Sequence, residues 1–225
     1  MQLLMILAIL PAFLLLVYIK KLDRIDKEPT DLLIKLFAFG ALTTVSAIIL
    51  ELLGDFILRM FFTQNALPYK LISNFIVVAL AEESGKYYVL NKITKNHDAF
   101  NYTFDAVVYA VTVSLGFATL ENILYVLVGG IGTALLRAVM SVPGHAIFGV
   151  FMGYYYGISK MKHRKKIGVL LAPVLLHGFY DFCLNMNHPA FFVAFLMFEI
   201  IITIVAARKV RVLSDEDTPL EDSFY

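Results

Sequence analysis

Residues 71–91 read LISNFIVVALAEESGKYYVLN. A helix of about 20 mostly apolar residues is long enough to cross the hydrocarbon core of a bilayer. This stretch nevertheless contains Glu82, Glu83 and Lys86. An ionisable side chain at mid-membrane costs at least about 2.5–3.5 kcal/mol on insertion scales. A membrane-spanning helix that keeps three such residues must pair them, hydrate them or use them.

The rest of the chain shows the same apolar character. Of its 225 residues 60% are hydrophobic and only 16% are charged, whereas soluble domains are roughly 45–50% apolar. The composition predicts an all-α, polytopic membrane helix bundle, with residues 1–213 as one transmembrane domain. Its apolar stretches predict about seven transmembrane helices, near residues 2–19, 32–58, 71–91, 103–127, 134–158, 167–186 and 190–207.

The basic residues predict an orientation in the membrane. Lysine and arginine gather in every second connection, at residues 20–27, 92–95, 160–166 and 208–211. Since basic loops stay in the cytoplasm, the N-terminus is expected outside and the C-terminus inside. Residues 214–225 are acidic and poor in apolar side chains, which predicts a disordered cytoplasmic tail. The net charge of +1, without a continuous basic stripe, argues for the lipid bilayer and against nucleic acid as the partner.

Helical spacing sorts the intramembrane charges into partners. Glu82 and Lys86 stand four residues apart and are expected to neutralise each other, which leaves Glu83 turned toward another element. His177 and Asp181 also stand four apart, so the carboxylate can fix the orientation of the imidazole.

Four of the buried acidic and histidine residues are predicted to lie at similar depths in the membrane. At about 1.5 Å of rise per residue, Glu83 lies about 18 Å from the outer end of its span, and His145, His177 and Glu121 lie about 16, 15 and 10 Å from theirs. We therefore expect four spans to contribute to one site in the outer half of the bilayer. Gly149, Gly153 and Gly157 repeat every fourth residue below His145, which predicts a close approach of a neighbouring helix.

The chemistry of this residue set leaves several interpretations open. Glu83, Glu121, His145 and His177 supply nitrogen and oxygen ligands for one divalent metal such as zinc, with a carboxylate left as general base. The same residues can activate water without a metal. Buried carboxylates and imidazoles also build proton- or ion-coupled transporters, although the chain shows no convincing internal repeat. A membrane scaffold without catalysis is a third interpretation.

Four stretches in order also resemble a known family. They are Glu82-Glu83-Ser-Gly-Lys86, Phe117-Ala-Thr-Leu-Glu121-Asn-Ile-Leu-Tyr, His145-Ala-Ile-Phe-Gly149-Val-Phe-Met-Gly153 and Leu-Leu-His177-Gly-Phe-Tyr-Asp181-Phe. Together they resemble the PrsW proteins, bacterial membrane proteases distantly related to the CAAX prenyl-protease and Abi superfamily. Lys27-Glu28-Pro29 and Asp105-Ala-Val-Val-Tyr-Ala110 extend the similarity over nearly the whole chain.

The resemblance implies a multi-pass protein of the bacterial cell membrane that makes the site-1 cut in a single-span anti-sigma factor near the outer face. Other proteases then complete the release of the sigma factor. The family's catalytic positions correspond to Glu82, Glu83, Glu121, His145 and His177, with Asp181 in support. The wider superfamily usually has histidine where Glu121 stands, and a carboxylate there fits zinc less well than an imidazole.

Overall fold

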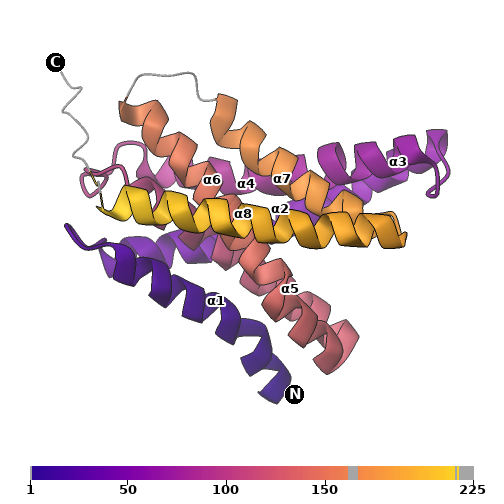
Figure 1. Cartoon of the computed structure of the whole chain (residues 1–225), viewed down its shortest axis with the longest axis horizontal. Coiled ribbons are helices and arrows are strands. Elements are labelled where there is room, and N and C mark those ends of the chain that lie inside the picture. Colours follow the sequence, from indigo (N-terminus) through magenta and orange to yellow (C-terminus); the bar gives the residue numbers. More distant parts are fainter. Residues whose placement is uncertain (1, 162–166, 216, 218–225) are drawn as a thin grey trace.

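The computed structural model describes residues 2–161, 167–215 and 217, and this part of the chain is helical without a strand (Figure 1). The all-α prediction is confirmed for these residues. The helical elements are α1 (Gln2–Leu22), α2 (Thr30–Phe61), α3 (Leu67–Ile72), the π-helical η1 (Ser73–Ala79), α4 (Leu80–Thr94), α5 (Asp105–Val139), α6 (Ser141–Met161), α7 (Ile167–Asn185) and α8 (Pro189–Asp215).

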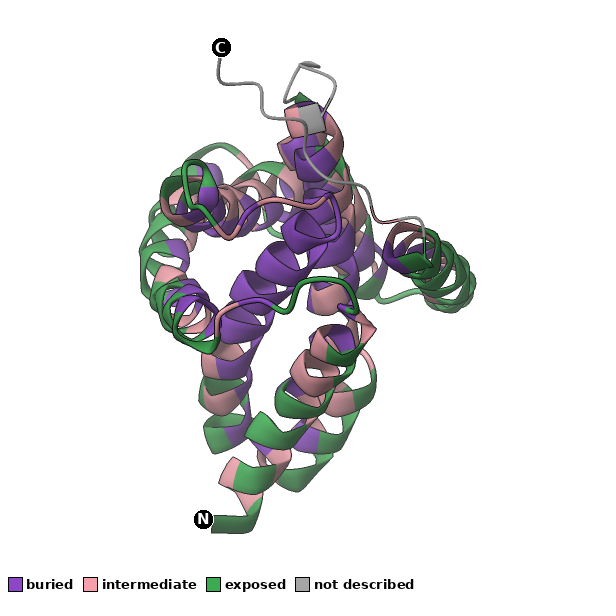
Figure 2. Ribbon diagram, turned by 90° about the vertical axis from the view of Figure 1, so that its left-hand side faces the viewer, coloured by how far each residue is buried: buried purple, intermediate pink, exposed green. Residues whose placement is uncertain are grey.

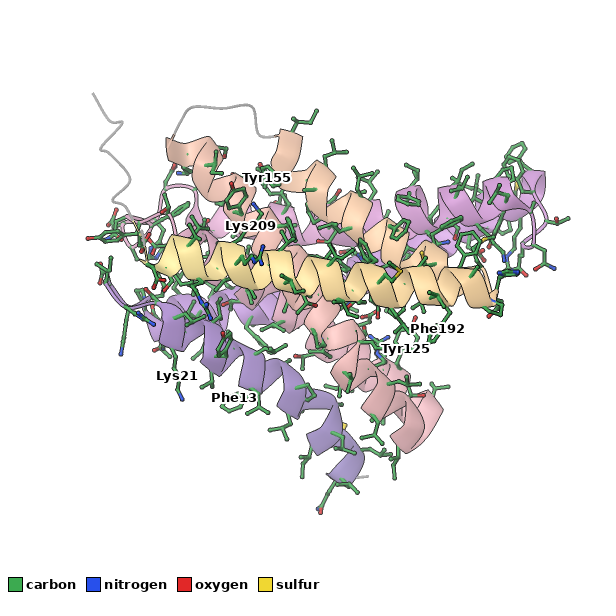
Figure 3. The ribbon with its side chains drawn as sticks, viewed as in Figure 1. Phe13, Lys21, Tyr125, Tyr155, Phe192 and Lys209 are labelled. Carbon is green, nitrogen blue, oxygen red and sulfur yellow. The ribbon has the colours of Figure 1, made fainter. Side chains whose placement is uncertain are left out.

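Within the described part of the chain, five helical stretches are long and apolar enough to cross a membrane: Gln2–Leu22, Thr30–Phe61, Asp105–Lys160, Ile167–Asn185 and Pro189–Asp215. Their outer surfaces carry large apolar side chains. Phe13 on α1 is 56% exposed and Phe192 on α8 is 48% exposed, and both point away from the ribbon (Figure 3). A surface of this kind suits lipid, so the chain is a multi-pass membrane protein.

The first half of α5 forms the centre of the bundle. Every residue from 105 to 119 is buried, and the buried colour runs through the middle of the molecule (Figure 2). A helix that is apolar on all sides is expected to be surrounded by other helices. In agreement with this, α5 packs against α1, α2 and α6.

The chain reverses inside α5, at Gly130. This glycine has a φ of 71°, a left-handed conformation that glycine adopts without steric cost. As a result, Nη2 of Arg137 lies 2.7 Å from Oε2 of Glu121, whereas a straight helix would separate these residues by about 24 Å. Residues 105–129 and 131–139 are therefore two arms, and the second arm leads into α6.

The glycines of α6 let it contact the core of α5 directly. A Cβ at Gly153 would lie 2.5 Å from the backbone oxygen of Ala106 and from Cα of Val107. A Cβ at Gly149 would lie 3.0 Å from Cα of Val111. The predicted close approach of a neighbouring helix is confirmed.

The first two residues of the predicted tail, 214 and 215, belong to a helix. Helix α8 continues through Asp215, and the Ser214 hydroxyl donates a hydrogen bond to the Leu22 carbonyl. Asp217 accepts hydrogen bonds from the Thr103 hydroxyl and the Phe104 amide. The prediction of disorder for residues 216 and 218–225 falls outside the described residues.

The connection between α1 and α2 holds a buried acidic cluster. Asp23 accepts a hydrogen bond from the Glu28 amide at 3.1 Å, and the Tyr109 hydroxyl donates to the Glu28 carboxyl group. Burial raises the pKa of Glu28 to about 9, and the nearby Asp105 and Asp23 carboxyl groups act in the same direction. Burial also raises the pKa of Asp23. Glu28 is therefore a neutral acid at pH 7.

We predict that this buried acid makes the folded state less stable as the pH rises. Between about pH 4.5 and pH 9 the folded chain keeps the Glu28 proton, whereas the unfolded chain has released it, so stability is lost over that range. Glu28→Gln keeps a neutral side chain at every pH. Thermal unfolding in detergent at pH 6 and pH 8.5 should show a smaller pH-dependent loss for this variant than for the wild type, and an equal loss would refute the prediction.

The helix contact at Gly153 gives a second prediction. Gly153→Ala should lower the free energy of unfolding by about 1–3 kcal/mol, because the added methyl group meets backbone that cannot easily move. Gly132→Ala is the matched control, since nothing lies within 4 Å of a Cβ at that position. Thermal unfolding of both variants in detergent measures the difference. A Gly153 variant as stable as the control would contradict the close contact.

Candidate active site

Two glutamates and two histidines from three helices meet inside the bundle. Ligand atoms of Glu82 and Glu83 on α4, His145 on α6 and His177 on α7 all lie within 4.8 Å of one another. All four side chains are buried, and Glu83 is completely inaccessible. The π-helical η1 ends just before α4. Such segments interrupt the regular helical register and are frequent at functional sites.

Lys86 lies among these side chains. Its Nζ is 3.1 Å from Oε2 of Glu82, 2.8 Å from Oε1 of Glu83 and 3.2 Å from Nδ1 of His145. The predicted pairing of Glu82 with Lys86 is confirmed, and Glu83 faces another element as expected, since its Oε1 also lies 3.0 Å from Nδ1 of His177. The contact of Lys86 with Glu83 was not predicted. At three residues' separation Glu83 is also within reach of the flexible lysine side chain, so the ammonium group bridges both carboxylates.

Both histidines present Nδ1 to the cluster and have Nε2 held by a carboxylate outside it. Nδ1 of His177 lies 3.0 Å from Oε1 of Glu83, and its Nε2 lies 3.2 Å from Oδ2 of Asp181, the partner predicted by helical spacing. His145 has the same arrangement, because its Nε2 lies 2.9 Å from Oε2 of Glu121. Histidines that ligate metals usually have such a partner on the second nitrogen.

Depth predicted Glu121 as a member of the ligand group, but the structure places it next to that group. It lies outside the group of four, where it contacts His145 and accepts a 2.7 Å bond from Arg137. Glu82 stands in the group instead. Arg137 was not among the predicted site residues, since only the reversal at Gly130 brings it back to Glu121.

Aromatic rings surround the polar cluster. Phe148 stacks on His177 with ring centroids 4.9 Å apart, and Phe117 lies 3.9 Å below Nζ of Lys86. Rings in these positions exclude water and strengthen the electrostatic interactions among the charged groups.

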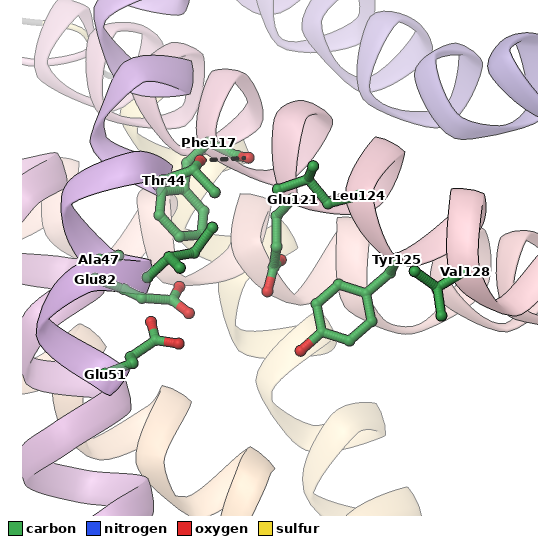
Figure 4. A pocket seen from close by; sticks show the side chains of 10 residues that line it. Thr44, Ala47, Glu51, Glu82, Phe117, Glu121, Leu124, Tyr125 and Val128 are labelled. Atoms are coloured by element: carbon green, nitrogen blue, oxygen red, sulfur yellow. Dashed lines mark hydrogen bonds between the residues drawn. The ribbon is translucent and has the colours of Figure 1, made fainter. Parts of the chain in front are cut away.

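Two adjoining cavities lead to the cluster, each with a volume of about 290 Å³. The first is mainly apolar and lies between α2 and α5 (Figure 4). Its lining includes Ile48 and Val128, whose side chains are exposed on the surface of the bundle. The second is polar and reaches His145 and His177. Four residues line both cavities: Glu51, Glu82, Glu121 and Tyr125. Together the cavities connect a lipid-facing surface with the buried site.

Glu51 is a further residue that sequence reasoning did not assign to the site. Its carboxyl group faces that of Glu82 across the cavity (Figure 4), and among the described residues it makes no hydrogen bond or ion pair. The signal was present in the sequence, because a glutamate interrupts the long apolar stretch that became α2.

The donor set meets the requirements of a divalent metal ion. Two carboxylates and two imidazoles within one small volume are a suitable ligand set for zinc. Oε2 of Glu83 is buried and has no hydrogen-bond partner in the described part of the chain, which leaves one ligand atom free. The residues therefore fit a metal.

A multi-pass helical bundle with a buried glutamate and histidine site, reached from a lipid-facing cavity, has the construction of an intramembrane protease. Sequence comparison agrees, since residues 28–207 match the PrsW family of intramembrane metalloproteases. The chain is 37% identical to Protease PrsW of Oceanobacillus iheyensis (90% of this chain, 92% of the relative) and 35% identical to that of Halalkalibacterium halodurans (93% and 96%). Identity to Protease PrsW of Bacillus subtilis is 33%, over 90% of this chain and 93% of the relative.

The chain therefore belongs to the PrsW family and is a membrane protease. No solved structure matches it. The transporter interpretation gains no support, because the relatives named above are all described as proteases.

Proposed function

We propose that this protein makes the site-1 cut in a single-span anti-sigma factor in the bacterial cell membrane. The observation that supports this most directly is the continuity between the cavity at α2 and α5 and the buried cluster. A substrate held in the bilayer can approach from the lipid without passing through water. The anti-sigma factor as substrate rests on the sequence motifs shared with the family.

The site residues proposed are Glu82, Glu83, Glu121, His145, His177 and Asp181. Glu83, His145 and His177 would hold a divalent metal, which when bound supplies positive charge to polarise the peptide carbonyl. Glu82 lines the cavity, so its carboxylate is placed to accept the proton of an attacking water. The water oxygen bonds to the carbonyl carbon, and Glu82 passes the proton to the leaving amine nitrogen as the peptide bond breaks.

Glu121 and Asp181 have equivalent positioning roles in this proposal. Each holds Nε2 of one histidine and so keeps Nδ1 directed into the cluster. Arg137 in turn fixes Glu121, at 2.7 Å. Glu121 thus acts through His145 and not as a metal ligand.

We further propose that the chain crosses the membrane seven times, with the N-terminus outside. Two observations account for the difference between seven crossings and the five long apolar stretches. The stretch Asp105–Lys160 reverses at Gly130 and thus supplies two crossings. Residues 67–94 form a further helical stretch that is divided by η1 and carries three charged site residues. Basic residues in alternate connections give the orientation.

Loss of either of two site residues should abolish cleavage. Glu83→Gln and His177→Ala should each reduce cleavage of a co-expressed anti-sigma factor by about a hundredfold or more, because each removes a group that holds the metal or orients its neighbours. Immunoblotting of substrate fragments gives the readout, and blotting of the membrane fraction shows whether each variant accumulates. Ser84→Ala is the control, since Ser84 is adjacent in sequence but lines a separate cavity. Normal cleavage by both site variants would remove the proposal.

The route through the lipid-facing cavity gives a separate prediction. Ile48→Trp should narrow the cavity between α2 and α5 and slow cleavage of the single-span substrate several-fold. Ile49→Trp is the matched control, because Ile49 is 54% exposed on the same helix and does not line the cavity. Initial cleavage rates of the two variants, measured in proteoliposomes, should differ. Equal rates would argue for another route of entry.

A further inference from the structure

Lys86 occupies the place where a bound cation would be expected. Its ammonium group contacts three of the four grouped ligand residues, at 2.8 Å from Glu83, 3.1 Å from Glu82 and 3.2 Å from His145. The side chain is completely buried, so water does not compensate its charge. These three contacts use a carboxylate oxygen of each glutamate and the inward-facing nitrogen of His145.

The position of Lys86 explains how the two glutamates can lie together inside the bundle. Two glutamates on one turn of α4 would repel each other in a medium of low dielectric constant. The ammonium between them supplies an opposite charge to both. Removing one partner from such a buried ion pair is strongly destabilising, because the remaining charge is left uncompensated.

A divalent metal and this ammonium group cannot share the same donor atoms. Nδ1 of His145 has one lone pair, and this lone pair faces Nζ of Lys86. Two cations held about 3 Å apart also repel strongly inside a protein.

We propose that Lys86 is a built-in counter-cation that occupies the donor set when no metal is bound and is displaced when a metal binds. The inference rests on the proposed metal-holding role of Glu83, His145 and His177. Lys86 thereby lowers the affinity for metal while it preserves the arrangement of the ligand residues in the metal-free protein.

The structure also offers the displaced ammonium group a new position. Nζ lies 3.9 Å over the ring of Phe117, and Phe117 lines the cavity between α2 and α5 (Figure 4). Glu51 and Glu121 line the same cavity. Glu51 makes no ion pair within the described ranges, so its carboxyl group can receive the lysine when the flexible stem turns over the ring.

Zinc titration of the full-length protein in nanodiscs tests the proposal. By isothermal titration calorimetry, Lys86→Met should bind zinc about tenfold or more tightly than the wild type, since the competing charge is gone. Lys86→Arg keeps the charge and should not gain affinity. Lys35→Met removes a lysine from an exposed position on α2 and should bind zinc like the wild type. In chelator, Lys86→Met should unfold at a lower temperature than the wild type, and zinc should close that difference.

A measurement on the wild type covers the case in which Lys86→Met does not fold. In wild-type protein labelled with ¹⁵N-lysine, the side-chain NMR signal of Lys86 is identified as the one that is absent from the spectrum of Lys86→Arg. Saturating zinc should shift this signal. The proposal is overturned if Lys86→Met binds zinc no more tightly than the wild type, if the Lys86 signal does not respond to zinc, or if neither protein binds zinc. None of these measurements needs a substrate. If substrate cleavage depends on Glu83 and His177 but Lys86 does not compete with zinc, the proposed function stands and this inference is removed.

Discussion

The interaction on which the site depends is the ion triplet of Glu82, Glu83 and Lys86. Three charged groups on one turn of a helix inside an apolar bundle are tolerated only if they compensate one another. The lysine reaches both glutamates, and the triplet then orders its neighbours, because Glu83 also holds Nδ1 of His177 and Lys86 contacts Nδ1 of His145. One local charge balance on α4 thus fixes the facing sides of α6 and α7.

The bundle around this triplet is rigid where the chemistry requires precision. The buried half of α5 packs directly on the glycines of α6, so His145 at the start of that glycine row has a fixed backbone. The second arm of α5 returns at Gly130 and places Arg137 on Glu121, which holds His145 from the other side. Packing and hydrogen bonding therefore orient the same imidazole independently.

Much of this arrangement could be predicted from the sequence, because membrane burial makes charged residues conspicuous. Apolar stretches located the helices, and helical spacing correctly paired His177 with Asp181. The depth of a residue in the membrane could not show whether Glu82 or Glu121 belongs to the group of four ligand residues. That depends on the direction of each side chain as well as on its depth. Arg137 and Glu51 depend on a chain reversal and on a cavity between helices, which are tertiary features that no local pattern encodes.

The need to keep the ligand residues assembled and the need to let a substrate reach them place opposite demands on this site. A fully enclosed cluster would be stable but inaccessible, whereas an open one would hydrate its charges and weaken every contact. The structure separates the two functions: Glu83 and Lys86 are inaccessible behind the rings of Phe117 and Phe148, while Glu82 alone of the triplet faces the cavities. A carboxylate at that boundary can exchange protons with a substrate-bound water, and the buried pair behind it need not be exposed.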